Sequence, residues 1–366
     1  MRVSFSYLDR QFAELDGYLA EIRALVRSSE LTLGPAVAEF ERRFAELSGL
    51  PHAVGVGTGT DALRFSLELS GVGSGDDVIT TPNTFIATVG AIVATGARPV
   101  FVDSEDGFVI DPDQIEAAIG PRTKAIVPVH YTGNVADMPA IARIAESRGL
   151  IVVEDACQAT AASIDGTPVG SWAASAAFSL HPLKNLNVWG DGGVIVTRSA
   201  DLAERLRLYR NHGLVSRDEV AIWGINSRLD ALQAVIGNRL IENVPTLTER
   251  RIAVAALYDA AFAGVDGIRV PVRRRGVRHV YHLYMIRAER RAELLQFLVD
   301  AEVEAKVHYP TPVHLQEAAR HLGYGEGDFP SAERDAKTVI TLPAHPYLTD
   351  DEVEYTIDRV RGFYGA

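Results

Sequence analysis

Cysteine is almost absent from this sequence, because Cys157 is the only one among 366 residues. One thiol can form no internal disulfide, and it cannot supply the several cysteine ligands of a zinc or iron–sulfur site. Long apolar runs are also lacking, and charged residues are spread through the first 27 positions, so neither a membrane span nor a signal peptide is expected. We therefore expect a cytoplasmic protein with no metal site and no membrane partner.

Basic residues are in the minority. The 36 lysines and arginines face 48 aspartates and glutamates, which gives a formal net charge of −12 and makes a nucleic-acid partner unlikely on electrostatic grounds. The basic cluster 273–275 is interpreted as a solvated turn, with contact to a diphosphate as the alternative. Hydrophobic residues make up 47% of the chain, enough for a large core with either two domains or one large and one small lobe.

Short apolar runs alternate with helical spacing through the first half of the chain, which predicts an α/β sheet of mostly parallel strands joined by crossover helices. Beyond residue 240 the order becomes helix, strand, strand, helix, strand, which predicts a small α+β domain. We expect a large domain over 1–240 and a small one over 241–366. The expected strands are 52–56, 78–80, 98–102, 125–129, 150–153, 176–180 and 194–197, then 268–272, 280–287 and 304–308 in the small domain.

Lys184 lies between two predicted strands, just before the glycine-rich turn 190–193. Such a position keeps the amine near the protein interior, where burial lowers its pKa and leaves it neutral enough to attack a carbonyl. This is the state that Schiff-base chemistry with an aldehyde cofactor requires. The alternative interpretation is a solvated lysine on a turn.

Two more segments place polar groups where strands end, the usual position of functional residues in such sheets. The turn 57–60 precedes a predicted helix over 61–69, and free N–H groups at a helix start can bind a phosphate. Asp155 follows an apolar strand, and a buried carboxylate there needs a cationic or hydrogen-bonding partner. The alternatives are an ordinary N-capped helix at the turn and a helix-capping role for Asp155.

Several motifs follow one another in a single order along the chain, and together they resemble the DegT/DnrJ/EryC/StrS family of sugar aminotransferases. The resemblance implies the fold type I of pyridoxal 5'-phosphate (PLP) enzymes, similar to aspartate aminotransferase, with a large mostly parallel sheet domain and a smaller C-terminal α+β domain. The motifs are GT at 59–60, TPNTFIAT at 81–88, EDACQA at 154–159, FSLHPLKN at 178–185, GINSRLDALQAVIG at 224–237, HVYHLYMIR at 279–287, HYPTPVHLQ at 308–316 and LPAHPYLTDDEVEYTI at 342–357.

The resemblance also implies roles for individual residues. Lys184 matches the Schiff-base lysine, which then moves a proton as general base and acid. Asp155 matches the aspartate that pairs with the pyridine nitrogen. Gln158, three residues on and expected on the same helix face, matches the residue beside the ring hydroxyl. The remaining matches are Gly59, Thr60 and Ser179 at the phosphate, Phe85 stacked on the ring, and Asn226 reaching the phosphate of a neighbouring subunit.

If Asn226 acts across subunits, the protein is a homodimer with shared active sites; the alternative is a turn residue before a helix that starts near Arg228. His308, Tyr309 and His314 are expected near the substrate, with a helix-capping role as the alternative for His314. Arg228 is interpreted as structural. Gln158 and the run 187–189 differ from the family's commonest forms.

The resemblance implies transfer of an amino group from L-glutamate or L-glutamine to a keto-sugar, and the expected keto-sugar is a nucleotide-linked keto-deoxysugar. The family's sugar dehydratases replace the lysine with histidine, whereas this chain keeps Lys184. The alternatives are a PLP-dependent dehydratase or lyase, an aminotransferase acting on a cyclitol ketone such as an inosose, and a catalytically inert PLP-binding regulatory protein. The sequence selects neither the sugar nor the carbon that is aminated.

Overall fold

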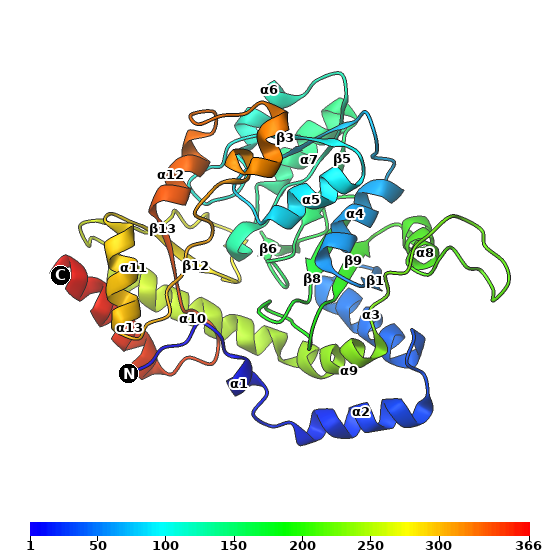
Figure 1. Cartoon of the computed structure of the whole chain (residues 1–366), viewed down its shortest axis with the longest axis horizontal. Coiled ribbons are helices and arrows are strands. Elements are labelled where there is room, and N and C mark those ends of the chain that lie inside the picture. Colours follow the sequence, from blue (N-terminus) through cyan, green and yellow to red (C-terminus); the bar gives the residue numbers. More distant parts are fainter.

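The computed structural model describes residues 1–366 and is built around a seven-stranded sheet in the order β1-β9-β8-β5-β4-β2-β3 (Figure 1). Six strands run in the same direction, and β9 alone runs against its neighbours β1 and β8. The expected mostly parallel sheet is therefore present. Its strands are β1 (His52–Val56), β2 (Asp77–Thr80), β3 (Arg98–Phe101), β4 (Thr123–Ile126), β5 (Ile151–Asp155), β8 (Ser175–Ser179) and β9 (Gly193–Thr197).

Helices cover both faces of this sheet. Neighbouring residues of each strand point to opposite sides, so apolar side chains lie on both faces and pack against helices there. Ala53 and Ile79 pack in the core beneath α3, α7 and α9, whereas Val54 and Val78 pack in the core beneath α4, α5 and α8. A strand buried on both faces reads as a continuous apolar run. The helices of this part are α1 (Leu8–Gln11), α2 (Asp16–Ser28), α3 (Gly34–Ser48), α4 (Gly59–Leu69), α5 (Ile86–Ala94), α6 (Ile115–Ala118), α7 (Met138–Arg148), α8 (Ala200–Tyr209) and α9 (Ala231–Leu240).

The C-terminal part has a core of its own around a three-stranded antiparallel sheet in the order β10-β12-β13. The segment 304–308, expected as the third strand, forms only an isolated bridge between Lys306 and Thr341, and the third strand is 339–342 instead. Pro310 and Pro312 follow closely, and proline cannot donate to a strand ladder. The elements are α10 (Val244–Phe262), β10 (Ile268–Arg269), β12 (Tyr284–Ala288), α11 (Arg291–Asp300), α12 (Pro330–Thr338), β13 (Val339–Leu342) and α13 (Asp350–Tyr364).

A third, small sheet joins the two parts, because β11 (Val277–Arg278) pairs with β6 (Ser163–Ile164), which pairs with β7 (Thr167–Pro168). The N-terminus lies against the C-terminal part, where Val3 pairs with Val303 (Figure 1). No helix is both long enough and apolar enough to span a membrane. Short 3-10 helices occupy Pro112–Gln114, Tyr131–Gly133, Ile241–Asn243, Val313–Leu315 and Glu317–Leu322.

Candidate active site

A cleft of about 340 Å³ opens where the parallel strands of the large sheet end. Loops that follow β1, β2, β5 and β8 meet there, because the carboxyl ends of parallel strands lie at one edge of the sheet. The structure thus brings together segments from four distant parts of the sequence. Nine of the residues expected at the site line this cleft: Gly59, Thr60, Phe85, Asp155, Gln158, Ser179, Lys184, His308 and Tyr309.

Helix α4 begins at one end of the cleft. Thr58 is its N-cap, and its side-chain oxygen accepts the N–H of Asp61 at 3.0 Å. The N–H groups of Gly59 and Thr60 have no acceptor in the protein, so they are free for an anion. A Cβ at position 59 would lie 2.7 Å from the Cβ of Ser179, so only glycine lets the Ser179 hydroxyl approach these groups.

Asp155 lies at the end of β5 with 5% of its surface exposed. Its Oδ2 accepts the hydroxyl of Thr88 at 2.6 Å, and its Oδ1 accepts the N–H of Cys157 at 3.1 Å. No lysine or arginine forms an ion pair with this carboxylate. Turns follow it in place of the expected helix, so the helix-capping alternative is wrong, and Gln158 shares no helix face with Asp155.

Gln158 nevertheless reaches the cleft, since the turn after Asp155 folds it back over the sheet edge. Its Oε1 accepts the N–H of Thr132 at 2.7 Å, which fixes the orientation of the amide. The donating end of the amide therefore faces the cleft, suited to a hydroxyl or phenolate oxygen.

Lys184 is partly buried, and its amine has no hydrogen-bond or ion-pair partner. Burial lowers the pKa of this amine, while the charge of Asp155 acts in the opposite direction. The neutral form of the amine, which is the nucleophile, is therefore more populated near pH 7 here than on an exposed lysine.

One wall of the cleft is aromatic. Phe85 precedes α5 and keeps 46% of its surface exposed, with its ring 5.7 Å from that of Tyr309. Burial raises the pKa of Tyr309 to about 12 and lowers the pKa of His308 to about 4, so both side chains are neutral near pH 7. An exposed phenylalanine in a concave site offers a flat face for a ring.

Two expected site residues lie elsewhere in this chain. His314 is 1% exposed, packs against Phe329 and contacts Glu333 at 3.2 Å, so it does not line the cleft. It lies within a short 3-10 helix and caps no helix. Asn226 is exposed at the base of the segment between α8 and α9, where it pairs with Asn211, and the hydroxyl of the adjacent Ser227 accepts the N–H of Gly57 at 3.0 Å. The segment itself extends away from the body of the protein (Figure 1). The helix that follows begins at Ala231 rather than near Arg228.

The cleft fits PLP in its shape and in its unpaired groups. The free N–H groups of Gly59 and Thr60 suit a phosphate, and the exposed face of Phe85 suits an aromatic ring. The buried carboxylate of Asp155 has no cationic partner within the chain, and a protonated pyridine nitrogen would supply one. The amine of Lys184 also has no partner and is free for the aldehyde of the cofactor. The phosphate, the pyridine nitrogen and the aldehyde of PLP would thus each find an unpaired group in the cleft.

Three residues of the site were missed by the sequence analysis. Thr88 lies three positions after Phe85, and that helical spacing could have placed it beside the cleft. Thr132 lies in the 3-10 helix Tyr131–Gly133 and His282 lies in the loop before β12, and no local pattern indicates that either is close to the cleft.

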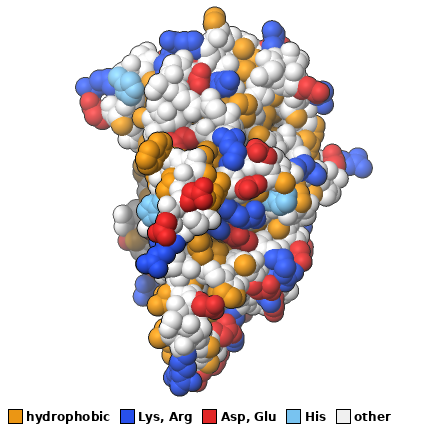
Figure 2. Space-filling model, turned by 90° about the vertical axis from the view of Figure 1, so that its right-hand side faces the viewer, with side chains coloured by type: hydrophobic (Ala, Val, Ile, Leu, Met, Phe, Trp, Pro, Cys, Tyr) orange, Lys and Arg blue, Asp and Glu red, His pale blue; other side chains and the backbone are white.

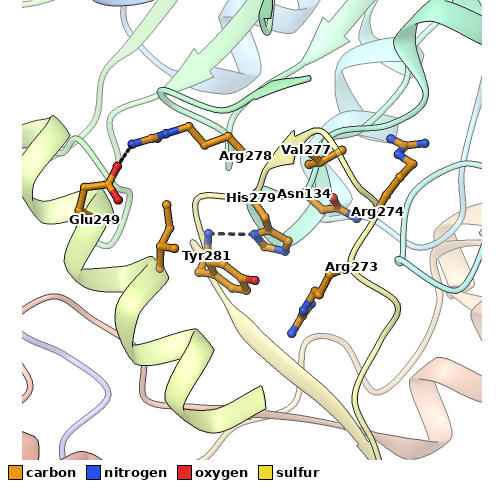
Figure 3. A pocket seen from close by; sticks show the side chains of 9 residues that line it. Asn134, Glu249, Arg273, Arg274, Val277, Arg278, His279 and Tyr281 are labelled. Atoms are coloured by element: carbon orange, nitrogen blue, oxygen red, sulfur yellow. Dashed lines mark hydrogen bonds and ion pairs between the residues drawn. The ribbon is translucent and has the colours of Figure 1, made fainter. Parts of the chain in front are cut away.

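A second cavity of about 330 Å³ lies between α10 and the loop that leads to β12 (Figure 3). Its arginines are each paired with acidic side chains. Arg273 binds Asp259 at 2.8 Å, and Arg278 binds Glu249 at 2.5 Å. Arg274 lies 3.4 Å from Asp137. The cluster expected as a solvated turn is thus largely an ion-paired surface, and it lies outside the cleft.

Comparison with known proteins agrees with the fold. The sequence profile of the DegT/DnrJ/EryC1/StrS aminotransferase family matches residues 15–361. Two relatives are each 41% identical. They are the pleiotropic regulatory protein of Geobacillus stearothermophilus, over 100% of this chain and 99% of the relative, and the dTDP-3-amino-3,4,6-trideoxy-alpha-D-glucose transaminase of Streptomyces venezuelae, over 98% and 96%.

Solved structures give the same answer. The S. venezuelae protein DesV in complex with a ketimine intermediate superposes with a TM-score of 0.97 at 40% identity, covering 100% of this chain and 99% of that one. NtdA from Bacillus subtilis, with bound cofactor PMP, superposes with a TM-score of 0.93 at 30% identity, covering 100% and 86%. The fold is that of the PLP-dependent aminotransferases. The chain belongs to the DegT/DnrJ/EryC1/StrS aminotransferase family, and the expected family, fold class and enzyme class are confirmed.

Proposed function

We propose that this protein is a PLP-dependent aminotransferase that moves the amino group of L-glutamate or L-glutamine to a keto-sugar. The observation that supports it best is one cleft with an unpaired lysine amine, a buried carboxylate without a cationic partner, and a helix start with free N–H groups. When bound, PLP supplies an aldehyde and an electron-accepting ring that carry the amino group between substrates.

Each side chain has a role that follows from its environment. Gly59, Thr60 and Ser179 bind the phosphate, and Phe85 covers one face of the ring. Asp155 pairs with the pyridine nitrogen and is itself held by Thr88. Gln158 donates to the ring hydroxyl. Lys184 would hold the aldehyde carbon of the cofactor, and its amine could take up and return a proton of the substrate, because its lowered pKa lets it act as base near neutral pH.

The proposed acceptor is a nucleotide-linked keto-deoxysugar. The names of several relatives support this class, since they are transaminases of dTDP-linked amino sugars and, in Acidithiobacillus ferrooxidans, a UDP-N-acetyl-3-dehydro-alpha-D-glucosamine 3-aminotransferase. His308 and Tyr309, both neutral, line the cleft where hydroxyl groups of a sugar would lie. His314 is withdrawn from this set because it lies outside the cleft.

We further infer a cytoplasmic homodimer, with the chain divided into domains at about residue 240. The separate cores of the two parts support the division. The segment 211–226 forms a hairpin-like arm with bridges at Asn211–Asn226 and Leu214–Val220, and Trp223 on it is 92% exposed. The face shown in Figure 2 exposes hydrophobic side chains among mixed charges. Asn226 lies exposed at the base of this arm, so a second subunit that packs against the arm can bring its cleft within reach of Asn226.

Half-reaction spectroscopy tests the enzyme class. L-Glutamate or L-glutamine alone should convert the PLP absorbance of the purified protein to that of PMP. The compound that causes this conversion is the amino donor. Addition of a candidate keto-sugar should then restore the PLP spectrum. A protein that binds PLP but never forms PMP with either donor contradicts the proposal.

Subunit mixing tests the shared site. Lys184→Ala and Asn226→Asp dimers should each be nearly inactive, the second because a carboxylate repels the phosphate. After exchange of subunits, a mixed dimer contains one intact site, so activity should rise to about a quarter of the wild-type value. Mixtures that stay as inactive as the parents would mean that Asn226 serves its own subunit.

A regulatory protein remains the second candidate, favoured by the name of the G. stearothermophilus relative. An inert protein has no need to keep the lysine amine unpaired, and this chain keeps it so. A yellow protein that is inactive with every donor, every nucleotide keto-sugar and an inosose would favour the regulatory function. Activity with the inosose alone would instead identify a cyclitol aminotransferase, and water loss without PMP formation would identify a dehydratase.

A further inference from the structure

The loop that bears Lys184, residues 181–192, contains neither helix nor strand. Its backbone makes few bonds of its own: the N–H of Lys184 donates to the carbonyl of His181 at 2.8 Å, and that of Val188 donates to Leu180 at 2.9 Å. A loop so weakly tied by its own backbone needs outside contacts if a reacting amine on it is to stay in place.

Two such contacts come from the body of the protein, where Asn185 donates to the carbonyl of Val280 at 3.0 Å and Gln233 donates to that of Trp189 at 2.9 Å. The others come from the N-terminal segment 7–18. The hydroxyl of Tyr7 donates to the carbonyl oxygen of Lys184 at 3.1 Å. The amides of Gln11 and Asn187 form two hydrogen bonds with each other, both of 2.9 Å. The Trp189 ring lies 5.5 Å from the ring of Phe12 and 5.4 Å from that of Tyr18. Asn187 and Trp189 are thus both held by this segment.

The direction of the Tyr7 hydrogen bond is fixed by Arg251. The guanidinium of Arg251 lies 3.1 Å from the Tyr7 oxygen and can only donate, so the phenol oxygen accepts from it. The phenol hydrogen is then left for the carbonyl of Lys184, which no other protein donor reaches. Burial raises the pKa of Tyr7, so this hydrogen is retained at neutral pH.

Arg251 is itself fixed in the C-terminal part. It is 3% exposed, has no carboxylate partner, and donates to the carbonyls of Tyr281 at 3.2 Å and Ala344 at 3.4 Å. A chain of two hydrogen bonds therefore runs from the C-terminal core through Tyr7 to the backbone of the lysine.

We propose that Tyr7, oriented by Arg251, is a positioning residue that holds the backbone of Lys184 so that its amine faces the cofactor. It acts through the lysine and touches neither substrate nor cofactor. Gln11 provides the second fixed point of the same loop, through Asn187. The proposal rests on the function proposed above.

The test compares Tyr7→Phe with Tyr355→Phe in the PLP-loaded enzyme. Tyr355 is the matched control, because its hydroxyl also donates to a backbone carbonyl, that of Ala301 at 3.1 Å, but within the C-terminal part. Tyr7→Phe should lower kcat about five- to tenfold, the effect of one lost hydrogen bond, with the KM for the amino donor within about twofold of wild type. The pH midpoint of the cofactor absorbance should move by about half a unit in Tyr7→Phe only.

Gln11→Leu provides a second readout if Tyr7→Phe folds poorly. It removes the two amide bonds to Asn187 and leaves Arg251 untouched, and it should change the absorbance midpoint in the same direction as Tyr7→Phe. A wild type without PLP absorbance would refute the proposed function itself. An active wild type in which both variants match Tyr355→Phe in kcat and midpoint would refute only the positioning role.

Discussion

Two cavities of the molecule have nearly equal volume, about 340 Å³ at the sheet edge and about 330 Å³ beside α10, and they differ in how their charges are paired. In the first, neither Lys184 nor Asp155 forms an ion pair, and the N–H groups at the start of α4 have no acceptor. In the second, Arg273 binds Asp259, and Arg278 binds Glu249, the pair drawn in Figure 3.

The number of charged residues in a cavity therefore does not indicate whether the cavity is a functional site. Groups left unpaired cost stability, since burial without a partner is unfavourable, and a protein keeps them where a ligand will pair with them. Paired groups have no such requirement. The cleft is therefore the site, although the second cavity holds more arginines.

The largest effect is expected from Lys184→Ala. Without its base and nucleophile the enzyme should lose turnover by about 10³-fold or more, whereas removal of an unpaired buried amine should leave the thermal unfolding temperature unchanged or slightly raised. Steady-state kinetics and a thermal melt measure the two. If the turnover of Lys184→Ala stayed within tenfold of the wild-type value, the unpaired amine would not mark the cleft as the active site.

Asp155→Asn should have the next largest effect. The amide preserves the volume and can still accept from Thr88, but it supplies no negative charge for the pyridine nitrogen, so kcat should fall about 10²-fold. Single-turnover kinetics with the amino donor isolates the step. If this variant reacts at the wild-type rate, the buried carboxylate has only a structural role.

Gly59→Ala tests the phosphate end of the cleft. The added methyl would meet Ser179 at 2.7 Å, so the affinity for PLP should fall about tenfold. Gly362→Ala is the control, because Gly362 lies in α13 with open space around it, and alanine there should stabilise the helix by up to about 1 kcal/mol. Fluorescence titration with PLP measures the affinity, and equal affinities in the two variants would contradict the proposed phosphate site.

Arg278→Met should have the smallest effect. Its pair with Glu249 is partly exposed, so the free energy of unfolding should fall by no more than about 1 kcal/mol, with kcat and KM within about twofold of wild type. Denaturant unfolding and steady-state kinetics check both. A tenfold loss of activity would give the second cavity a function that its paired charges argue against.

Much of the large domain could be predicted from the sequence, because strands such as β5 and β9 contain apolar runs that follow helical or turn segments. Lys184 and Asp155 could be singled out from their places at strand ends. The turn after Asp155 could not, since EDACQA has helical composition and is bent instead by the Asp155–Cys157 contact. The strand 339–342 was missed because its partner β12 lies more than 50 residues earlier.

Tyr7 and Arg251 show a further limit of sequence reasoning. They are 244 residues apart, and only the folded chain brings the phenol between the guanidinium and the lysine loop. His314 illustrates the opposite error, because a motif position was assigned to the substrate although the side chain packs under Phe329.

The contacts of the first dozen residues bear on the order of events during synthesis. Val3 pairs with Val303, and Arg10 binds Glu352 at 2.7 Å, so the segment beneath the lysine loop is held by strands and helices that leave the ribosome last. A nascent chain that has already completed its large sheet therefore still lacks the support under Lys184. Capture of the vitamin-derived cofactor should accordingly follow release of the whole polypeptide, and an affinity tag is better attached after residue 366 than before residue 1.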